Sequence, residues 1–334
     1  MPISLVTRDD FYALSKAIKK HGWKFLATKL KLKAAARVKA QWDTYQSAGT
    51  NWWDISMVRD RWNRKITGNE KYDWEQYVVE KYVGNRQNLS ILSIGCGTGE
   101  KERVFAKFPQ FSAIVGMDVS EKSIQKAREI ASQNQYSTIS YRADDFTKAD
   151  FGQEKFDFVL FYSSLHHFRN IEALLQNNVI PVLKSGGLVI VFEYTGPNRF
   201  QYHRNQLEEA NRCLSLLPSS MKLRSDDTVK RTIYQPGLLR TILNDPSEAP
   251  SSESILPSIQ KWLRPLEEKP VGGAILHMLL KDIAHHFTDT SNSEAIKYLG
   301  TLFQEEDAFY EKTGQSDFWF GVYGLKELGN SRKS

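Results

Sequence analysis

Three glycines at alternate positions, Gly95, Gly97 and Gly99, separate a short apolar segment from a predicted helix that begins at Glu100. Glycine adopts backbone conformations that other residues avoid, and its missing Cβ lets a ligand approach the main chain closely. The first turn of the helix offers unpaired N–H groups to an anionic part of that ligand. The sequence therefore predicts a ligand-binding turn between a strand and a helix.

The spacing of these glycines distinguishes two classes of ligand. A dinucleotide pyrophosphate is typically bound by G-x-G-x-x-G, whose third glycine falls one position after Gly99. That position is Glu100, whose charge would repel a pyrophosphate. Asp118 ends the next predicted strand, where a carboxylate can accept hydrogen bonds from both hydroxyls of a ribose. The pattern favours a nucleoside that carries an amino-acid tail.

Apolar strands alternate with amphipathic helices from residue 89 onward, which predicts a doubly wound, Rossmann-like α/β fold. We expect a mostly parallel sheet of seven strands with an N-terminal helical arm and an inserted lid. Strands are expected at 89–94, 112–118, 137–141, 156–162, 188–193, 263–268 and 318–325. Helices are expected at 100–107, 120–133, 171–182, 252–260, 274–287 and 293–312.

The positive charge is concentrated in the first 40 residues, which hold ten basic and two acidic side chains. The whole chain of 334 residues carries a formal charge of +6, so the remainder is close to neutral. The basic segment suits either docking to a membrane, a polyanion or a sister subunit, or a lid helix with a solvated basic face. We divide the chain into a basic helical arm (1–75), a core (76–194), a proline-rich lid (195–250) and a C-terminal part of the core (251–334).

The composition excludes several classes of protein. Apolar residues form 41% of the chain, which is enough to bury a core. The two cysteines, Cys96 and Cys213, are too few for a disulfide scaffold or a Cys-rich zinc site and fit a reducing compartment. No apolar run approaches the roughly 20 residues of a membrane-spanning helix, and no secretory signal is recognised. We expect a cytoplasmic protein.

On these motifs the chain resembles the class I S-adenosylmethionine (SAM) dependent methyltransferases, most closely over residues 75–195. The glycine turn matches the family's first motif, which lines the methionine part of SAM, and Asp118 matches its ribose-binding acid. The resemblance implies a SAM site formed by Gly95, Cys96, Gly97, Gly99, Asp118, Val119, Asp144, Asp145, Phe146 and Tyr162.

Within that site the resemblance leaves one choice open. Either Asp144 or Asp145 matches the acid that receives the adenine amino group, and we favour Asp145, with Phe146 packing on the ring. Tyr162 begins a segment that resembles the fourth motif, beside the sulfonium. The chain departs from the family at Ser93, because an acid usually stands two residues before the first glycine.

Three residues are the leading candidates for acceptor chemistry. A neutral imidazole of His166 or His167 could accept a proton from an acceptor hydroxyl, and the alternative is a structural histidine beneath the sheet edge. Glu193 ends the fifth strand, where open α/β sheets bind ligands, so it could hold the acceptor or act as a base. Its alternative is a structural carboxylate that pairs with Arg199.

Other polar residues are secondary candidates. Tyr202, His203 and Arg204 could reach the acceptor from the lid. His277 lies on an apolar helix, where a core position is the simpler interpretation. His285 and His286 lack the spaced partners of a metal site, so no metal is expected.

The resemblance favours an enzyme that transfers the methyl group of SAM to a hydroxyl of a small-molecule, sugar or glycan acceptor. The tetrapeptide that family members use on nucleobase or glutamine amino groups is replaced by a segment that begins at Tyr162. No nucleic-acid partner is expected. A homodimer and a peripheral membrane contact of the arm are compatible with the sequence. Two alternatives remain, an RNA or protein methyltransferase that docks through the arm and a non-catalytic SAM-binding scaffold.

Overall fold

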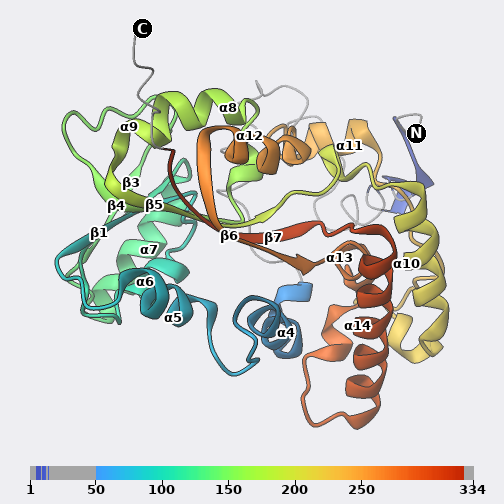
Figure 1. Cartoon of the computed structure of the whole chain (residues 1–334). Helices are drawn as coiled ribbons and strands as arrows, with labels where there is room; N and C mark the ends of the chain where they lie inside the picture. Colours follow the sequence, from blue (N-terminus) through green and yellow to red (C-terminus); the bar gives the residue numbers. More distant parts are fainter. Residues whose placement is uncertain (1–4, 9, 13, 15–49, 327–334) are drawn as a thin grey trace, which may run out of the picture. The chain divides into compact units, whose positions relative to one another are not determined.

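A computed structural model describes residues 5–8, 10–12, 14 and 50–326. It contains a seven-stranded sheet in the order β3-β2-β1-β4-β5-β7-β6, as expected for the α/β fold (Figure 1). The strands are β1 Leu89–Ile94, β2 Phe111–Asp118, β3 Ile139–Ala143, β4 Phe156–Tyr162, β5 Leu183–Tyr194, β6 Leu263–Gly272 and β7 Phe318–Leu325. The chain order reverses between β1 and β4, which is where such sheets bind their ligands.

Strands β1 to β5 pair in parallel, and β1 lies between β2 and β4. Leu92 is in register with Val115 on one side and Val159 on the other. Near-continuous apolar runs form these strands because both faces of the sheet are covered. The carboxyl ends of β1, β2, β4 and β5 consequently meet at one edge.

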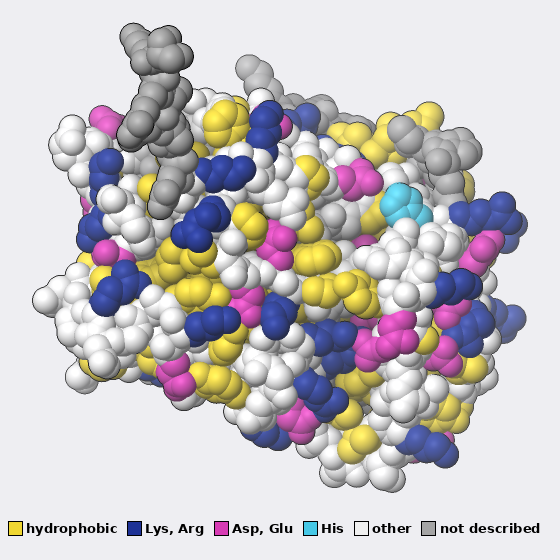
Figure 2. Space-filling view, viewed as in Figure 1, with side chains coloured by type: hydrophobic (Ala, Val, Ile, Leu, Met, Phe, Trp, Pro, Cys, Tyr) yellow, Lys and Arg dark blue, Asp and Glu magenta, His cyan; other side chains and the backbone are white. Residues whose placement is uncertain are grey.

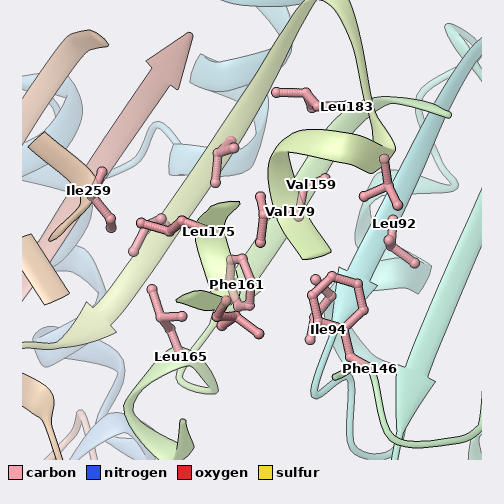
Figure 3. Packing of buried hydrophobic residues seen from close by; sticks show 14 of the residues in the cluster. Leu92, Ile94, Phe146, Val159, Phe161, Leu165, Leu175, Val179, Leu183 and Ile259 are labelled. Carbon is pink, nitrogen blue, oxygen red and sulfur yellow. The ribbon is translucent and has the colours of Figure 1, made fainter. Parts of the chain in front are cut away.

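Helices on opposite sides of these strands complete the core (Figure 1). One layer contains α6 Glu100–Phe105 and α7 Glu121–Gln133, and the other contains α8 Ile171–Leu174, α9 Ile180–Val182 and α12 Ile255–Trp262. The second layer covers an apolar cluster that includes Leu175, Val179 and Ile259 (Figure 3). As predicted, the hydroxyl of Ser120 caps α7 by accepting a hydrogen bond from the N–H of Ser123, at 3.2 Å.

Two predicted helices are interrupted. The helix expected at 171–182 contains a π-helical turn at Leu175–Val179 ahead of Pro181, which cannot donate a backbone hydrogen bond. The helix expected at 274–287 ends at Leu280, because the ammonium of Lys230 donates to the carbonyls of Met278, Leu279 and Lys281 at its C-terminus. The first interruption follows from the ring of Pro181, and the second follows from Lys230, which is distant in the sequence.

The chain forms two compact units that differ from the domains expected from sequence. Among the described residues, the core unit comprises 78–193, 253–269 and 320–326, and the cap unit comprises those up to 77 together with 194–252 and 270–319. Residues 270–319 were expected in the core. They belong to the cap unit because α13 Leu276–Leu280 and α14 Ser293–Thr313 pack on α10 Arg204–Leu216 of the lid segment.

Paired charges and aromatic rings hold the cap unit together. Glu306 accepts hydrogen bonds from the backbone N–H groups of Gly273, Ile275 and Leu276 and pairs with Arg61 at 2.8 Å. Trp52 packs edge-on against Trp62, with ring centroids 5.1 Å apart. The unit also contains α4 Ser56–Thr67, most of α5 Trp74–Val78, and α11 Leu238–Asn244.

Most of the predicted basic arm lies outside the described residues, so its helices and docking role stay predictions. On the face shown in Figure 2, basic and acidic side chains are interspersed. Of the helices within residues 50–326, none combines the length and apolarity needed to cross a bilayer.

Candidate functional site

The glycine turn adopts the conformation that its sequence predicts. Gly95, Gly97 and Gly99 all have positive φ angles, of 70°, 54° and 80°. Beneath the turn there is no room for side chains, because a Cβ on Gly95 would lie 2.5 Å from the Cβ of Ser164 and one on Gly99 would lie 2.2 Å from the hydroxyl of Tyr141. A Cβ on Gly97 would meet nothing within 4 Å. The turn is packed from below and accessible at its centre, which suits close approach of a ligand.

Asp118 at the end of β2 holds this turn. One carboxylate oxygen accepts a hydrogen bond from the N–H of Gly97 at 3.0 Å, and the other accepts one from the N–H of Ser120 at 2.8 Å. Val119 beside it is 41% exposed, although it is apolar. Asp118 and Val119 lie at the sheet edge where a nucleoside is expected. They place a carboxylate next to an exposed apolar side chain.

The segment after β3 agrees with the expected adenine side only in part. Asp144 is tied to Asp118 through a backbone hydrogen bond of 3.0 Å, which brings the ends of β2 and β3 together. Asp145 is bonded to Thr147 and Lys148, and these bonds lower the pKa of its carboxyl although partial burial acts in the opposite direction. Phe146 differs from the expectation, because its ring is buried in the core beside Ile94 and presents no open face (Figure 3). Asp144 is the more exposed of the two acids and is therefore the more available to a ligand.

The segment after β4 packs against the packed side of the turn. The hydroxyl of Ser164 donates to the carbonyl of Ile94 at 2.6 Å, which fixes this segment to the end of β1. Ser163 has a positive φ of 49°, a conformation uncommon for residues other than glycine and concentrated at functional sites. The ammonium of Lys101 lies 4.4 Å from the ring centre of Tyr162, within the range of a cation–π contact.

Glu193 and His166, predicted separately, form one buried pair. One oxygen of Glu193 bonds Nδ1 of His166, and the other accepts hydrogen bonds from the backbone N–H groups of Ser164 and Leu165, at 2.7 and 2.6 Å. Glu193 is 0% exposed. The ring of His167 lies beside that of His166, with centroids 4.1 Å apart. Arg199, the alternative partner considered for Glu193, donates instead to the carbonyls of Pro246 and Glu248.

The sequence did not single out Glu102, which lies beneath the glycine turn. Its side chain is 1% exposed, and neither carboxylate oxygen has a hydrogen-bond partner among the described residues. Burial raises the pKa of this carboxyl to about 7, against a smaller opposing effect of the nearby Ser93 hydroxyl. The available signal was its position three residues before Phe105 on the buried face of α6.

Cys96 in the turn is a protonated thiol. Burial, reinforced by the nearby Glu102 and Asp118 carboxyls, raises its pKa well above the ordinary value. A protonated thiol is a poor nucleophile, so Cys96 is a weak candidate for covalent chemistry.

The cap unit contains a cavity of about 260 Å³, lined on one side by Phe200, Tyr202 and His277. The Tyr202 hydroxyl and Nδ1 of His277 are 3.4 Å apart. Asp245 also lines the cavity, and it is 5% exposed with one carboxylate oxygen that has no hydrogen-bond partner among the described residues. Tyr202 and His277, secondary candidates from sequence, therefore share a pocket.

The remaining candidates have structural roles. The N–H of His203 is capped by the Gln206 side chain at the start of α10, and Arg204 forms an exposed ion pair with Glu208. Nε2 of His286 bonds the carbonyl of Leu223 at 2.7 Å.

The family profile described as a methyltransferase domain matches residues 85–267, more than half of the chain. A sterol 24-C-methyltransferase from Kluyveromyces lactis is 26% identical over 193 residues, which cover 58% of this chain and 49% of that enzyme. A demethylmenaquinone methyltransferase from Tropheryma whipplei is 28% identical over 177 residues, 52% of this chain and 68% of that protein. The structure of phosphoethanolamine N-methyltransferase 2 from Haemonchus contortus with SAM aligns at 13% identity and a TM-score of 0.49, over 85% of this chain and 62% of that one. The chain spans about half the length of the sterol enzyme that it matches.

Proposed function

Because the chain belongs to the class I SAM-dependent methyltransferases, with SAM as cofactor, we propose that it methylates a hydroxyl group of a small polar acceptor such as a sugar or glycan unit. The observation that carries the proposal is the buried pair of Glu193 and His166 at the carboxyl ends of β5 and β4. When bound, SAM supplies a methyl group on a positively charged sulfur. The chain binds SAM and removes a proton from the acceptor.

Cofactor binding is assigned to the turn and to Asp118. Gly97 gives the methionine part close access to the main chain, and the carboxylate of Asp118 accepts hydrogen bonds from the ribose hydroxyls. Val119 offers an exposed apolar surface for the base. Asp144 is the better placed acid for the adenine amino group, because Asp145 is held by Lys148.

Proton removal is assigned to His166. The carboxylate of Glu193 at Nδ1 stabilises the tautomer that carries its proton there, so the basic lone pair is on Nε2. With SAM bound, Nε2 would accept the proton of the acceptor hydroxyl, while the sulfonium would supply the methyl group to that oxygen and keep the electron pair of the broken carbon–sulfur bond as a neutral thioether. The imidazolium that results is stabilised by Glu193, whose other oxygen is fixed by two N–H groups.

The cavity of the cap unit is suited by itself to a polar ligand. Its lining combines aromatic rings with charged groups of both signs, among them Arg224 and Asp245. Sugars and other polyols present donors, acceptors and apolar ring faces together, and such a lining can satisfy all three. Asp245 adds a largely buried carboxylate to this lining.

A transfer assay with methyl-labelled SAM tests the proposal. Monosaccharides and small phenols are offered beside a quinol and a sterol, because the sterol relative is named for methylation at carbon. We expect methyl ethers from the monosaccharides or the small phenols. Turnover should be at least a hundredfold lower in His166→Ala. His167→Ala is the matched control and should retain most activity. Methyl transfer to carbon, or full turnover without His166, would contradict the proposal.

A cytoplasmic location and a homodimer are further parts of this proposal. The free thiols of Cys96 and Cys213 support a reducing compartment. Light scattering on the purified chain tests the dimer.

A further inference from the structure

Glu102 is a carboxyl of the core unit whose burial is costly. It follows the glycine turn directly in the chain, as the third residue after Gly99. A polar group that is buried without a hydrogen bond destabilises the folded state, and a buried carboxylate without one does so more strongly. Neither oxygen of Glu102 has a hydrogen bond of ordinary geometry within the described residues, and the nearby Ser93 hydroxyl and the backbone N–H of Glu102 favour the anion less than burial disfavours it. A buried group of this kind next to the glycine turn calls for a function.

The groups around Glu102 do not supply a counter-charge. Ser93 of β1 and Tyr141 of β3 face it with hydroxyls, and Cys96 of the turn faces it with a thiol. Burial, and next the charge of Glu102, raises the pKa of Tyr141, so the hydroxyl stays protonated. Lys101 and Arg103 lie on the same helix as Glu102. They lower the pKa of its carboxyl less than Ser93 does, and burial has the largest effect.

Lys101 and Arg103 have other partners. The Arg103 guanidinium donates to the carbonyl of Thr98 at 2.6 Å, and the Lys101 ammonium lies over the ring of Tyr162. Burial raises the pKa of the Glu102 carboxyl to about 7, so near neutral pH it holds a proton in part of the molecules. A positive charge that arrives at the turn would favour the ionised form.

SAM brings that charge, since it carries a sulfonium and an ammonium group. We propose that Glu102 is a positioning residue that senses the charge of the cofactor, losing its proton to solvent when SAM binds at the glycine turn. The proton leaves to the buffer, and the carboxylate that remains attracts the cationic cofactor from beneath the turn. Binding of SAM is thereby coupled to pH through a residue that lies outside the acceptor chemistry.

Calorimetry with SAM on the full chain measures this coupling. Titrations at pH 7 in buffers of different ionisation enthalpy should show release of about half a proton per SAM bound, because the carboxyl is about half protonated before binding. Between pH 6 and pH 8 the affinity for SAM should rise about tenfold. Glu102→Gln cannot ionise and should lose both effects, although it keeps the size of the side chain.

Glu100→Gln is the matched control, because Glu100 lies on the same turn of α6 with a side chain 77% exposed. It should release protons as the wild type does. The proposal is overturned if Glu102→Gln releases as many protons as the wild type. It is also overturned if the wild type itself shows no release between pH 6 and pH 8, a result that does not depend on whether any variant folds. Neither outcome involves methyl transfer, so the proposed function is tested separately.

Discussion

Two glutamates of the core unit are buried to the same extent and differ in everything around them. Glu193, at the end of β5, bonds two backbone N–H groups and an imidazole. Glu102, beneath the turn after β1, has no hydrogen-bond partner for either oxygen among the described residues. A carboxylate surrounded by donors is stabilised as an anion and can orient a neighbour. One that is surrounded by apolar and neutral groups keeps its proton to higher pH.

The difference predicts separate functional roles. The region around Glu193 is fixed before any ligand arrives, which suits a group that must align a base. The surroundings of Glu102 favour the protonated form of its carboxyl. This suits a group whose ionisation changes when a cation binds nearby. We therefore expect Glu193 to act in the acceptor chemistry and Glu102 to affect the affinity for the cofactor.

The largest effect should come from removing the charge of Glu193. In Glu193→Gln the imidazolium of His166 loses its carboxylate, so we expect kcat to fall about a thousandfold. The affinity for SAM should change less than threefold, because the glycine turn and Asp118 are untouched. Kinetics and calorimetry on the same preparation check both values. Loss of affinity without loss of kcat would reverse the roles assigned to the two glutamates.

Glu102 should make the stability of the folded protein depend on pH. Its pKa of about 7 in the folded protein exceeds the model-peptide value of 4.5, so the folded state binds more protons between these pH values. The contribution of Glu102 to the free energy of unfolding is fully present below pH 4.5. It falls by about 3 kcal/mol in total as the pH rises to 7. The free energy of unfolding of Glu102→Gln, measured by urea denaturation from pH 5 to pH 8, should lack this decline. A wild-type curve parallel to that of the variant would show that Glu102 is already ionised.

The smallest expected effect is a difference in stability between two substitutions in the glycine turn, one on its packed side and one on its open side. Gly99→Ala should destabilise the protein by about 2 kcal/mol more than Gly97→Ala, because only the first Cβ meets Tyr141. Both substitutions share the strain of a positive φ. Chemical denaturation gives the difference. Equal losses would mean that the Tyr141 ring moves aside, and the enclosure around Glu102 would then be looser than we describe.

The parts of the fold and site that the sequence predicts are local ones. The strands, the glycine turn, Asp118 and the cap at Ser120 each depend on residues close together in the chain. Glu193 and His166 were each identified, but their bond joins residues 27 apart, one on β5 and the other in the segment that follows β4, and no local pattern fixes which way the carboxylate points.

Glu102 shows why other features were missed. An acid in the first turn of a helix is ordinarily favourable and solvated, so its burial is visible only when β1, β3 and the turn are in place. The pocket of the cap unit likewise joins Phe200, Asp245 and His277, which come from irregular segments and a short helix. The division into units also depends on packing of α13 and α14 that hydrophobic periodicity does not reveal.

The interleaving of the two units has a consequence for how the polypeptide is made. The chain passes between the core unit and the cap unit five times, at residues 77, 193, 252, 269 and 319. Neither unit is a continuous stretch, so neither can be obtained by truncation at a linker. Strand β7 contributes residues to both, which means that synthesis must reach about Leu325 before either can finish folding. A nascent chain of this design depends on its last strand, and substitutions there should reduce yield more than activity per molecule.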